Sequence, residues 1–120
     1  MSRFVTPDES GPAPVARVSG EIDLANARRL HDELVAMAAG LEALVVDLTE
    51  VPYLDSAGVK TLFGVARELS QRDQALLLTV PIGSPLRRVL KITRVHEVAA
   101  ICDDVEAAFN LLGRPADPPI

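Results

Sequence analysis

Residues 44–71 constrain the fold more than any other stretch, because an apolar strand pattern gives way there to a helical one. Leu44, Val45 and Val46 form a short run of the kind found in a core strand of a parallel sheet. Pro52 then ends the ladder, since proline has no N–H to donate. Beyond it, apolar residues recur at helical spacing. This stripe consists of Val59, Leu62, Phe63, Ala66 and Leu69. The stretch therefore predicts a strand, a tight turn and a helix.

The turn itself reads Asp55-Ser56-Ala57-Gly58. Asp55 or Ser56 can cap the helix, because either side chain can accept a hydrogen bond from a free N–H of the first turn. Gly58 costs a helix interior about 1 kcal/mol relative to alanine, so we expect another backbone or a partner to come close to it. Two interpretations stay open from these residues alone: a capped helix start, or a junction that carries function.

The rest of the chain alternates between strand and helix patterns. Strands are predicted at residues 3–6, 15–18, 75–80 and 98–101, and helices at 25–39, 85–91 and 103–112, with a loop at 7–14. Asp23 is the expected N-cap of the first helix, and Gly40 its end. Ser84 and Pro85 are typical of a helix start. The expected buried stripe of the first helix is Leu24, Ala27, Leu30, Leu34, Met37 and Ala38.

This alternation predicts an α/β fold with a mixed, mostly parallel sheet of four to five strands and about four helices. Residues 1–11 are expected to form an edge strand and loop, 12–112 the single domain, and 113–120 a disordered tail. Loops at the carboxyl ends of parallel strands gather at one end of a sheet. These loops are 20–23, 52–58 and 81–84, so Asp23, Asp55, Ser56 and Gly83 should meet there.

Composition excludes several classes of function. The chain has 120 residues, enough for one domain, and its net charge of −5 argues against direct nucleic-acid binding. No apolar run approaches the ~18 residues of a membrane span, and we expect a cytosolic protein with no membrane contact. Cys102 is the single cysteine, and His31 and His96 stand apart, so neither a disulfide nor a metal site is predicted, and no cofactor.

Two further patterns concern enzymes and charge. The residue two before Ser56 is Leu54, so the Gly-x-Ser-x-Gly elbow of hydrolases is missing, and there is neither a triad nor the acid cluster of a response-regulator-like phosphoprotein. No enzyme activity is therefore predicted. The basic run Arg87, Arg88, Lys91 and Arg94 suits a solvated helix face, or else a contact with an acidic partner or nucleic acid.

Two segments carry a family resemblance. Gly20-Glu21-Ile22-Asp23 and Leu54-Asp55-Ser56-Ala57-Gly58-Val59 resemble the STAS domain of bacterial anti-sigma factor antagonists, and residues 86–90 and 98–109 are similar to the end of that domain. The resemblance spans about residues 12–112. It departs from the family at Ala57, where many members have a second hydroxyl, and at the turn 71–74, which lacks the usual glycines.

The resemblance implies a partner switch. Family members bind an anti-sigma factor that is also an ATP-dependent serine kinase, and this binding frees a sigma factor. The kinase phosphorylates the serine after the Asp, here Ser56, and a metal-dependent serine phosphatase resets the switch. The alternative is a STAS subunit of a lipid-transport ATPase complex. The partner-binding residues expected on the first interpretation are Asp23, Leu24, Asp55, Ser56, Ala57, Gly58, Lys60 and Gly83.

Charge explains how such a switch can act. A phosphate adds about −1.5 to −2 charges at neutral pH, and a helix N-terminus tolerates an anion because its free N–H groups and dipole favour negative charge. Asp55 is adjacent to Ser56, and Asp23 is expected nearby. We therefore expect phosphorylation to weaken a close-packed interface by local repulsion, without refolding. Whether the two acids only cap helices or also place the serine hydroxyl for a kinase stays open.

Overall fold

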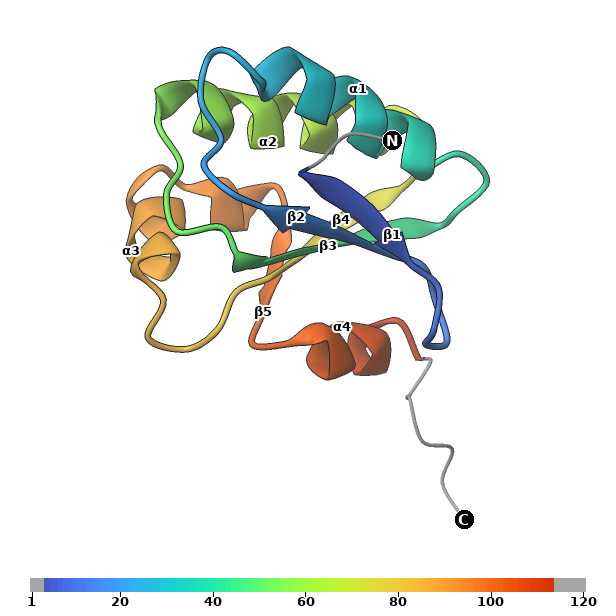
Figure 1. The fold of residues 1–120 in the computed structure, drawn as a ribbon. Helices are drawn as coiled ribbons and strands as arrows, with labels where there is room; N and C mark the ends of the chain where they lie inside the picture. The colour runs from blue at the N-terminus through green and yellow to red at the C-terminus, as the bar shows by residue number, and fades with distance from the viewer. Residues whose placement is uncertain (1–3, 114–120) are drawn as a thin grey trace.

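A five-stranded sheet with helices on both faces forms the frame of the molecule (Figure 1). The computed structural model describes residues 4–113. The strands are β1 (Val5–Asp8), β2 (Val15–Ser19), β3 (Ala43–Glu50), β4 (Ala75–Thr79) and β5 (Ala100–Cys102), and they lie side by side in that order. The β1–β2 pair is antiparallel and the other three pairs are parallel. The prediction of a mixed, mostly parallel α/β sheet is confirmed.

Within residues 4–113, four α-helices connect or follow these strands. They are α1 (Ala27–Met37), α2 (Ser56–Ser70), α3 (Pro85–Ile92) and α4 (Val105–Leu111), with a short 3-10 turn, η1 (Val95–Glu97), before β5. In Figure 1, α1 and α2 lie together over one face of the sheet and α4 covers the other. Asp55, one of the two cap candidates for α2, and Ser84, the predicted start of α3, each accept a backbone N–H of the first turn. Asp104 does the same at the start of α4.

Alternation along the strands separates two apolar layers. Val46, Leu48 and Leu78 face α1, α2 and α3 in the larger layer. Val45 and Leu77 face α4 in the smaller one. Successive side chains of a strand point to opposite faces, so a strand covered by helices on both sides needs apolar residues at consecutive positions. This explains the run Leu44-Val45-Val46 in β3, which Asp47 follows.

Some predicted element boundaries are wrong. The first strand begins at Val5 and includes Pro7 and Asp8, which were assigned to a loop; β1 is an edge strand, where a missing N–H is tolerated. The last strand begins at Ala100 and not at Val98, because η1 occupies the preceding residues. The expected tail from residue 114 onward lies outside the described residues.

The start of α1 is also corrected. The N-cap position is Asn26 and not Asp23. The Asp23 carboxylate instead accepts the Ala25 N–H at 2.9 Å, in a turn that precedes the helix. Leu24 is therefore not part of the buried stripe: 83% of its surface is exposed. Gly40 ends the helix region with a positive φ of 80°, as predicted.

One buried carboxylate joins three strands. Asp47, in the middle of β3, accepts hydrogen bonds from the hydroxyls of Thr49 (2.6 Å) and Thr79 (2.8 Å) and from the Arg17 guanidinium. Arg17 also bonds Asp8 of β1 at 2.7 Å. The Ser10 hydroxyl and N–H, followed by Arg17, lower the pKa of Asp8 to about 2. The network ties β1, β2, β3 and β4 together on the side of the sheet away from α1 and α2.

Candidate functional site

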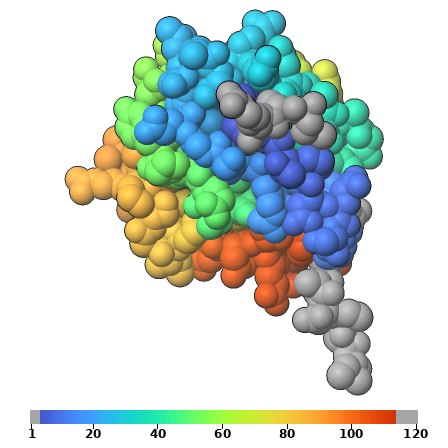
Figure 2. Space-filling model, in the orientation of Figure 1, coloured from blue at the N-terminus to red at the C-terminus, as the bar shows by residue number. Residues whose placement is uncertain are grey.

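The loops after β2 and β3 are joined at the carboxyl end of the sheet. Ile22 and Leu54 form an isolated parallel bridge. The Asp55 N–H donates to the Ile22 carbonyl at 3.4 Å, and the Ile22 N–H donates to the Tyr53 carbonyl at 3.4 Å. In Figure 1 these loops and the one after β4 leave the sheet on the same side, at the left. In Figure 2 the three segments adjoin on the surface. We call this surface the switch face, and define it by loops 20–26, 52–58 and 81–84.

Gly58 is what allows the two loops to lie so close. A Cβ at this position would lie 2.9 Å from Leu54 Cδ2 and 3.2 Å from the carbonyl oxygen of Ile22. The close approach expected from the sequence is therefore made within the chain, by the β2–α1 loop. Gly58 is buried, so its contribution to the switch face is to the packing beneath it.

Asp55 and Ser56 have different roles at the start of α2. The Asp55 carboxylate accepts the Gly58 N–H at 3.0 Å, which is the geometry of a helix N-cap. Ser56 is the first residue of the helix and is exposed. Within residues 4–113 its hydroxyl has no hydrogen-bond partner. The cap is therefore supplied by Asp55, and the Ser56 hydroxyl is left accessible to solvent.

A polar clamp fixes the loop that carries Asp23. The Asn26 side-chain amide donates to the Glu21 carbonyl at 2.9 Å, and its oxygen accepts the Asp23 N–H at 3.0 Å. These bonds close the turn before α1 and hold Asp23 on a rigid loop beside the one that carries Ser56. Asn26 was not predicted from the sequence. The pattern that could have indicated it is an Asn or Asp three residues after an acidic residue in a loop.

Three large apolar side chains are exposed on the switch face, one from each loop. Leu24 is 83% exposed, Tyr53 55% and Ile82 77%. Exposed apolar groups that cluster among polar ones are typical of protein interaction sites. Leu24 is among the residues expected from the sequence to bind a partner, whereas Tyr53 and Ile82 are not. Their only sequence signal is that each follows a proline that ends a strand.

The other expected residues surround this centre. Ala57 is half-buried, and its carbonyl accepts the Thr61 hydroxyl at 2.9 Å. Lys60 is exposed one turn further along α2, beside a hollow of about 440 Å³ that Arg28 and His31 also line. Gly83 is exposed in the β4–α3 loop with a φ of 92°, a conformation that favours glycine. It shares the switch face with Ser56, but no bond joins the two among the described residues.

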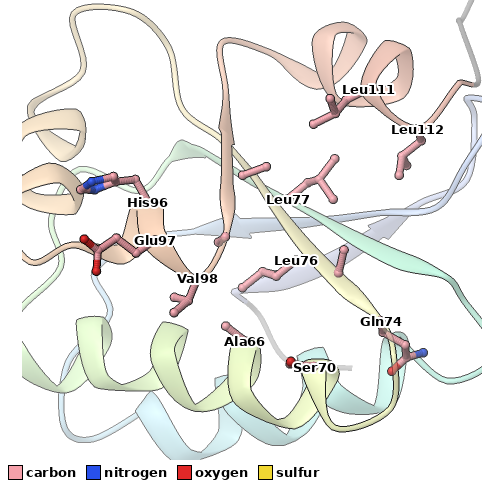
Figure 3. A pocket seen from close by; sticks show the side chains of 13 residues that line it. Ala66, Ser70, Gln74, Leu76, Leu77, His96, Glu97, Val98, Leu111 and Leu112 are labelled. Atoms are coloured by element: carbon pink, nitrogen blue, oxygen red, sulfur yellow. The ribbon is translucent and has the colours of Figure 1, made fainter.

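A larger hollow lies elsewhere in the molecule. It measures about 550 Å³, and Figure 3 shows it lined by side chains from β4, η1 and the end of α4. Ala66 and Ser70 of α2 complete the lining, which does not include any residue of the switch face. In the part of the chain that the structure describes, no cluster of three or more His, Cys, Asp or Glu side chains suits a metal ion. No helix among these residues is long and apolar enough to cross a membrane.

Comparisons with known proteins identify the family. The family model described as "Mlab, STAS domain" matches residues 5–103. The anti-sigma-B factor antagonist of Listeria monocytogenes is 34% identical over 95 residues, which cover 78% of this chain and 81% of that protein. The protein of the same name from Staphylococcus aureus is 26% identical over 91 residues, covering 75% and 83%.

A solved structure agrees with these matches. The crystal structure of an anti-sigma factor antagonist from Mycobacterium paratuberculosis superposes with a TM-score of 0.78 over 92% of this chain and 93% of that one, at 24% identity. At this identity the likeness concerns the fold. Together with the curated relatives and the Asp-Ser-x-Gly junction at the start of α2, it leads to one conclusion: the chain belongs to the STAS-domain family of anti-sigma factor antagonists.

Proposed function

We propose that this chain is a cytosolic anti-sigma factor antagonist that binds its anti-sigma factor through the switch face and is released when Ser56 is phosphorylated. The observation that carries the proposal is the placement of Ser56: an exposed hydroxyl without a hydrogen-bond partner in residues 4–113, next to a capping carboxylate and among exposed apolar side chains. In this proposal the chain acts by binding and has no catalytic role.

The face suits a protein partner better than a small substrate. Leu24, Tyr53 and Ile82 supply apolar area, and truncating such anchors commonly costs more than 1 kcal/mol of binding energy when they are buried at the centre of an interface. Asp23, Asp55 and Ser56 supply polar groups between them. Lys60 and Gly83 extend the same surface along α2 and the β4–α3 loop.

A phosphate on Ser56 would oppose this interface. It would stand at the first position of α2, where the helix dipole tolerates an anion, so the fold is kept. The Asp55 carboxylate next to it already accepts the Gly58 N–H. The added charge of about −1.5 to −2 then makes the centre of the face strongly anionic, and its burial against a partner becomes costly.

The proposed partner is an anti-sigma factor with ATP-dependent serine kinase activity, and a metal-dependent serine phosphatase restores the free hydroxyl. The test combines the full chain with candidate kinase-type anti-sigma factors and ATP, and measures intact mass and binding. One added phosphate that is absent in Ser56→Ala, followed by loss of binding, supports the switch. Ser70→Ala is the matched control, because Ser70 is also an exposed serine of α2.

The interface is tested separately from the phosphorylation. Leu24→Ala is expected to weaken binding of the anti-sigma factor by about 1 kcal/mol or more. Leu111→Ala, an exposed leucine at the end of α4, should leave it unchanged. Equal effects of the two changes would contradict the assignment of the switch face. Binding to a transport ATPase in place of any anti-sigma factor would support the alternative, a STAS subunit of a lipid-transport complex.

A further inference from the structure

The basic run that starts in α3 and ends at Arg94 is only half neutralised in the folded protein. Arg87 donates to the Val80 carbonyl at 2.8 Å and to Asp103 at 2.5 Å, and Arg94 pairs with Glu97 at 2.5 Å. Arg88 and Lys91 are exposed, and among residues 4–113 neither has a carboxylate within 4.0 Å. Asp103 and Glu97 thus pair with the other two arginines of the run.

These cations border a groove with an apolar floor. The groove measures about 410 Å³ and is lined by Arg87, Arg88, Leu90, Lys91, His96 and Ile101. Leu90 is buried and Ile101 of β5 is half-buried, and they supply the floor. The size lies within the range of small-molecule sites, which are mostly apolar with a few polar groups that fix orientation. Arg87, held by its two partners, is a rigid side of the groove.

The charge of the groove is unfavourable as it stands. Arg88 and Lys91 are three residues apart on one helix, where like charges repel by a few tenths of a kcal/mol. Yet the chain carries a net charge of −5, so these side chains concentrate positive charge on an otherwise acidic protein. A ligand with one anionic group would relieve the repulsion and lower the desolvation cost of both side chains.

We propose that the groove between α3 and β5 binds a small organic anion. A phosphate or carboxylate head lies between Arg88 and Lys91, and a flat apolar body rests on Leu90 and Ile101. Guanidinium groups suit such heads because their fork of N–H donors matches two oxygens. The site requires neither Ser56 nor the anti-sigma factor. Its test is therefore independent of the test of the proposed function.

The test uses naphthyl phosphate and the full chain, followed by amide NMR and by naphthalene fluorescence. Binding should shift the amides of Leu90, Lys91 and Ile101. Arg88→Glu/Lys91→Glu should weaken it by roughly tenfold or more, as expected for lost charge-assisted bonds. Arg29→Glu/Arg67→Glu is the control with the same change in charge, since both arginines are exposed and unpaired within the described chain. It should change binding by less than about twofold.

Three results would overturn the proposal. Equal weakening by both double variants would mean that net charge alone attracts the probe. Equal binding of naphthylmethylamine, a cation of similar shape, would mean that Arg88 and Lys91 play no part. Displacement by inorganic phosphate at the same concentration as the probe would mean that the apolar floor contributes nothing and that the site is a surface ion contact. Weakening confined to the α3 variant, with selectivity for the anion, supports it.

Discussion

Two glycines of α2 should respond to alanine with opposite signs. In a helix, glycine is about 1 kcal/mol less favourable than alanine, so replacing either would stabilise the protein if space allowed. At Gly64 there is space for a methyl group, because a Cβ would lie 3.4 Å from the His31 ring, an ordinary contact. At Gly58 there is not, because a Cβ would lie 2.9 Å from Leu54 Cδ2 and 3.2 Å from the backbone oxygen of Ile22.

The magnitudes follow from these contacts. Gly64→Ala should raise the free energy of unfolding by about 0.5–1 kcal/mol. Overpacking costs about 1–3 kcal/mol, so Gly58→Ala should lower it by about 1 kcal/mol after the helical gain is subtracted. The clash involves backbone, and the Asp55 N–H donates to that same carbonyl of Ile22. The β2–α1 loop must therefore shift, and Asp23 with it.

Urea unfolding of the two variants measures this directly. With a slope of about 2 kcal/mol per molar urea, the two midpoints should differ by about 1 M at an unchanged slope. Midpoints that move in the same direction would refute the argument that Gly58 is kept for close packing. If Gly58→Ala is destabilised and also phosphorylated more slowly than Gly64→Ala, the packing below the switch face positions Ser56.

Three further predictions concern the buried and titrating groups. Asp47→Asn should lower the free energy of unfolding in urea by about 2–4 kcal/mol, because Arg17 and two threonine hydroxyls lose a buried anion; an unchanged midpoint would contradict this. The folded pKa of Asp8, about 2, lies below its unfolded value of 3.8, so its contribution to stability is present above pH 4 and disappears as the pH falls toward 2. The urea midpoints of wild type and Asp8→Asn should therefore converge as the pH falls. A difference between the two midpoints that grows in acid would contradict this direction. Burial raises the pKa of the Cys102 thiol, so its alkylation by iodoacetamide at pH 8 should be slow in the native protein and fast in urea.

Periodicity predicted the central unit because its signals were local. The apolar run of β3, the cap at Asp55 and the stripe of α2 each depend on neighbouring residues, and the structure has them at the predicted places. The gathering of the three loops followed from the rule for parallel sheets, and the Ile22–Leu54 bridge confirms it for two of them.

Other features depended on which of several alternative local interactions forms in the folded protein, and the sequence does not reveal this. Asp23 was a plausible cap, but the Asn26 side chain closes the preceding turn and delays α1. Arg94 adopts a left-handed φ of 66°, which reverses the chain into η1 and moves β5 two residues onward. The exposure of Tyr53 and Ile82 was not predicted because an apolar residue in a loop is as easily buried as exposed, and only the tertiary arrangement decides between them.

The order of strands in the sheet has a consequence for synthesis on the ribosome. Because β1 to β5 are neighbours in the same order in space and in the chain, each strand can join the growing sheet as soon as it emerges, without waiting for a later segment to be inserted. Pairing only between strands that are neighbours in the chain keeps the contact order below that of a sheet in which a late strand is inserted between earlier ones. The segment up to α2 already contains both halves of the Ile22–Leu54 bridge. Ser56 would thus be in position before the α3–β5 groove exists, and nascent chains long enough to expose residues 1–80 outside the ribosome should already protect the Asp55 amide from hydrogen exchange.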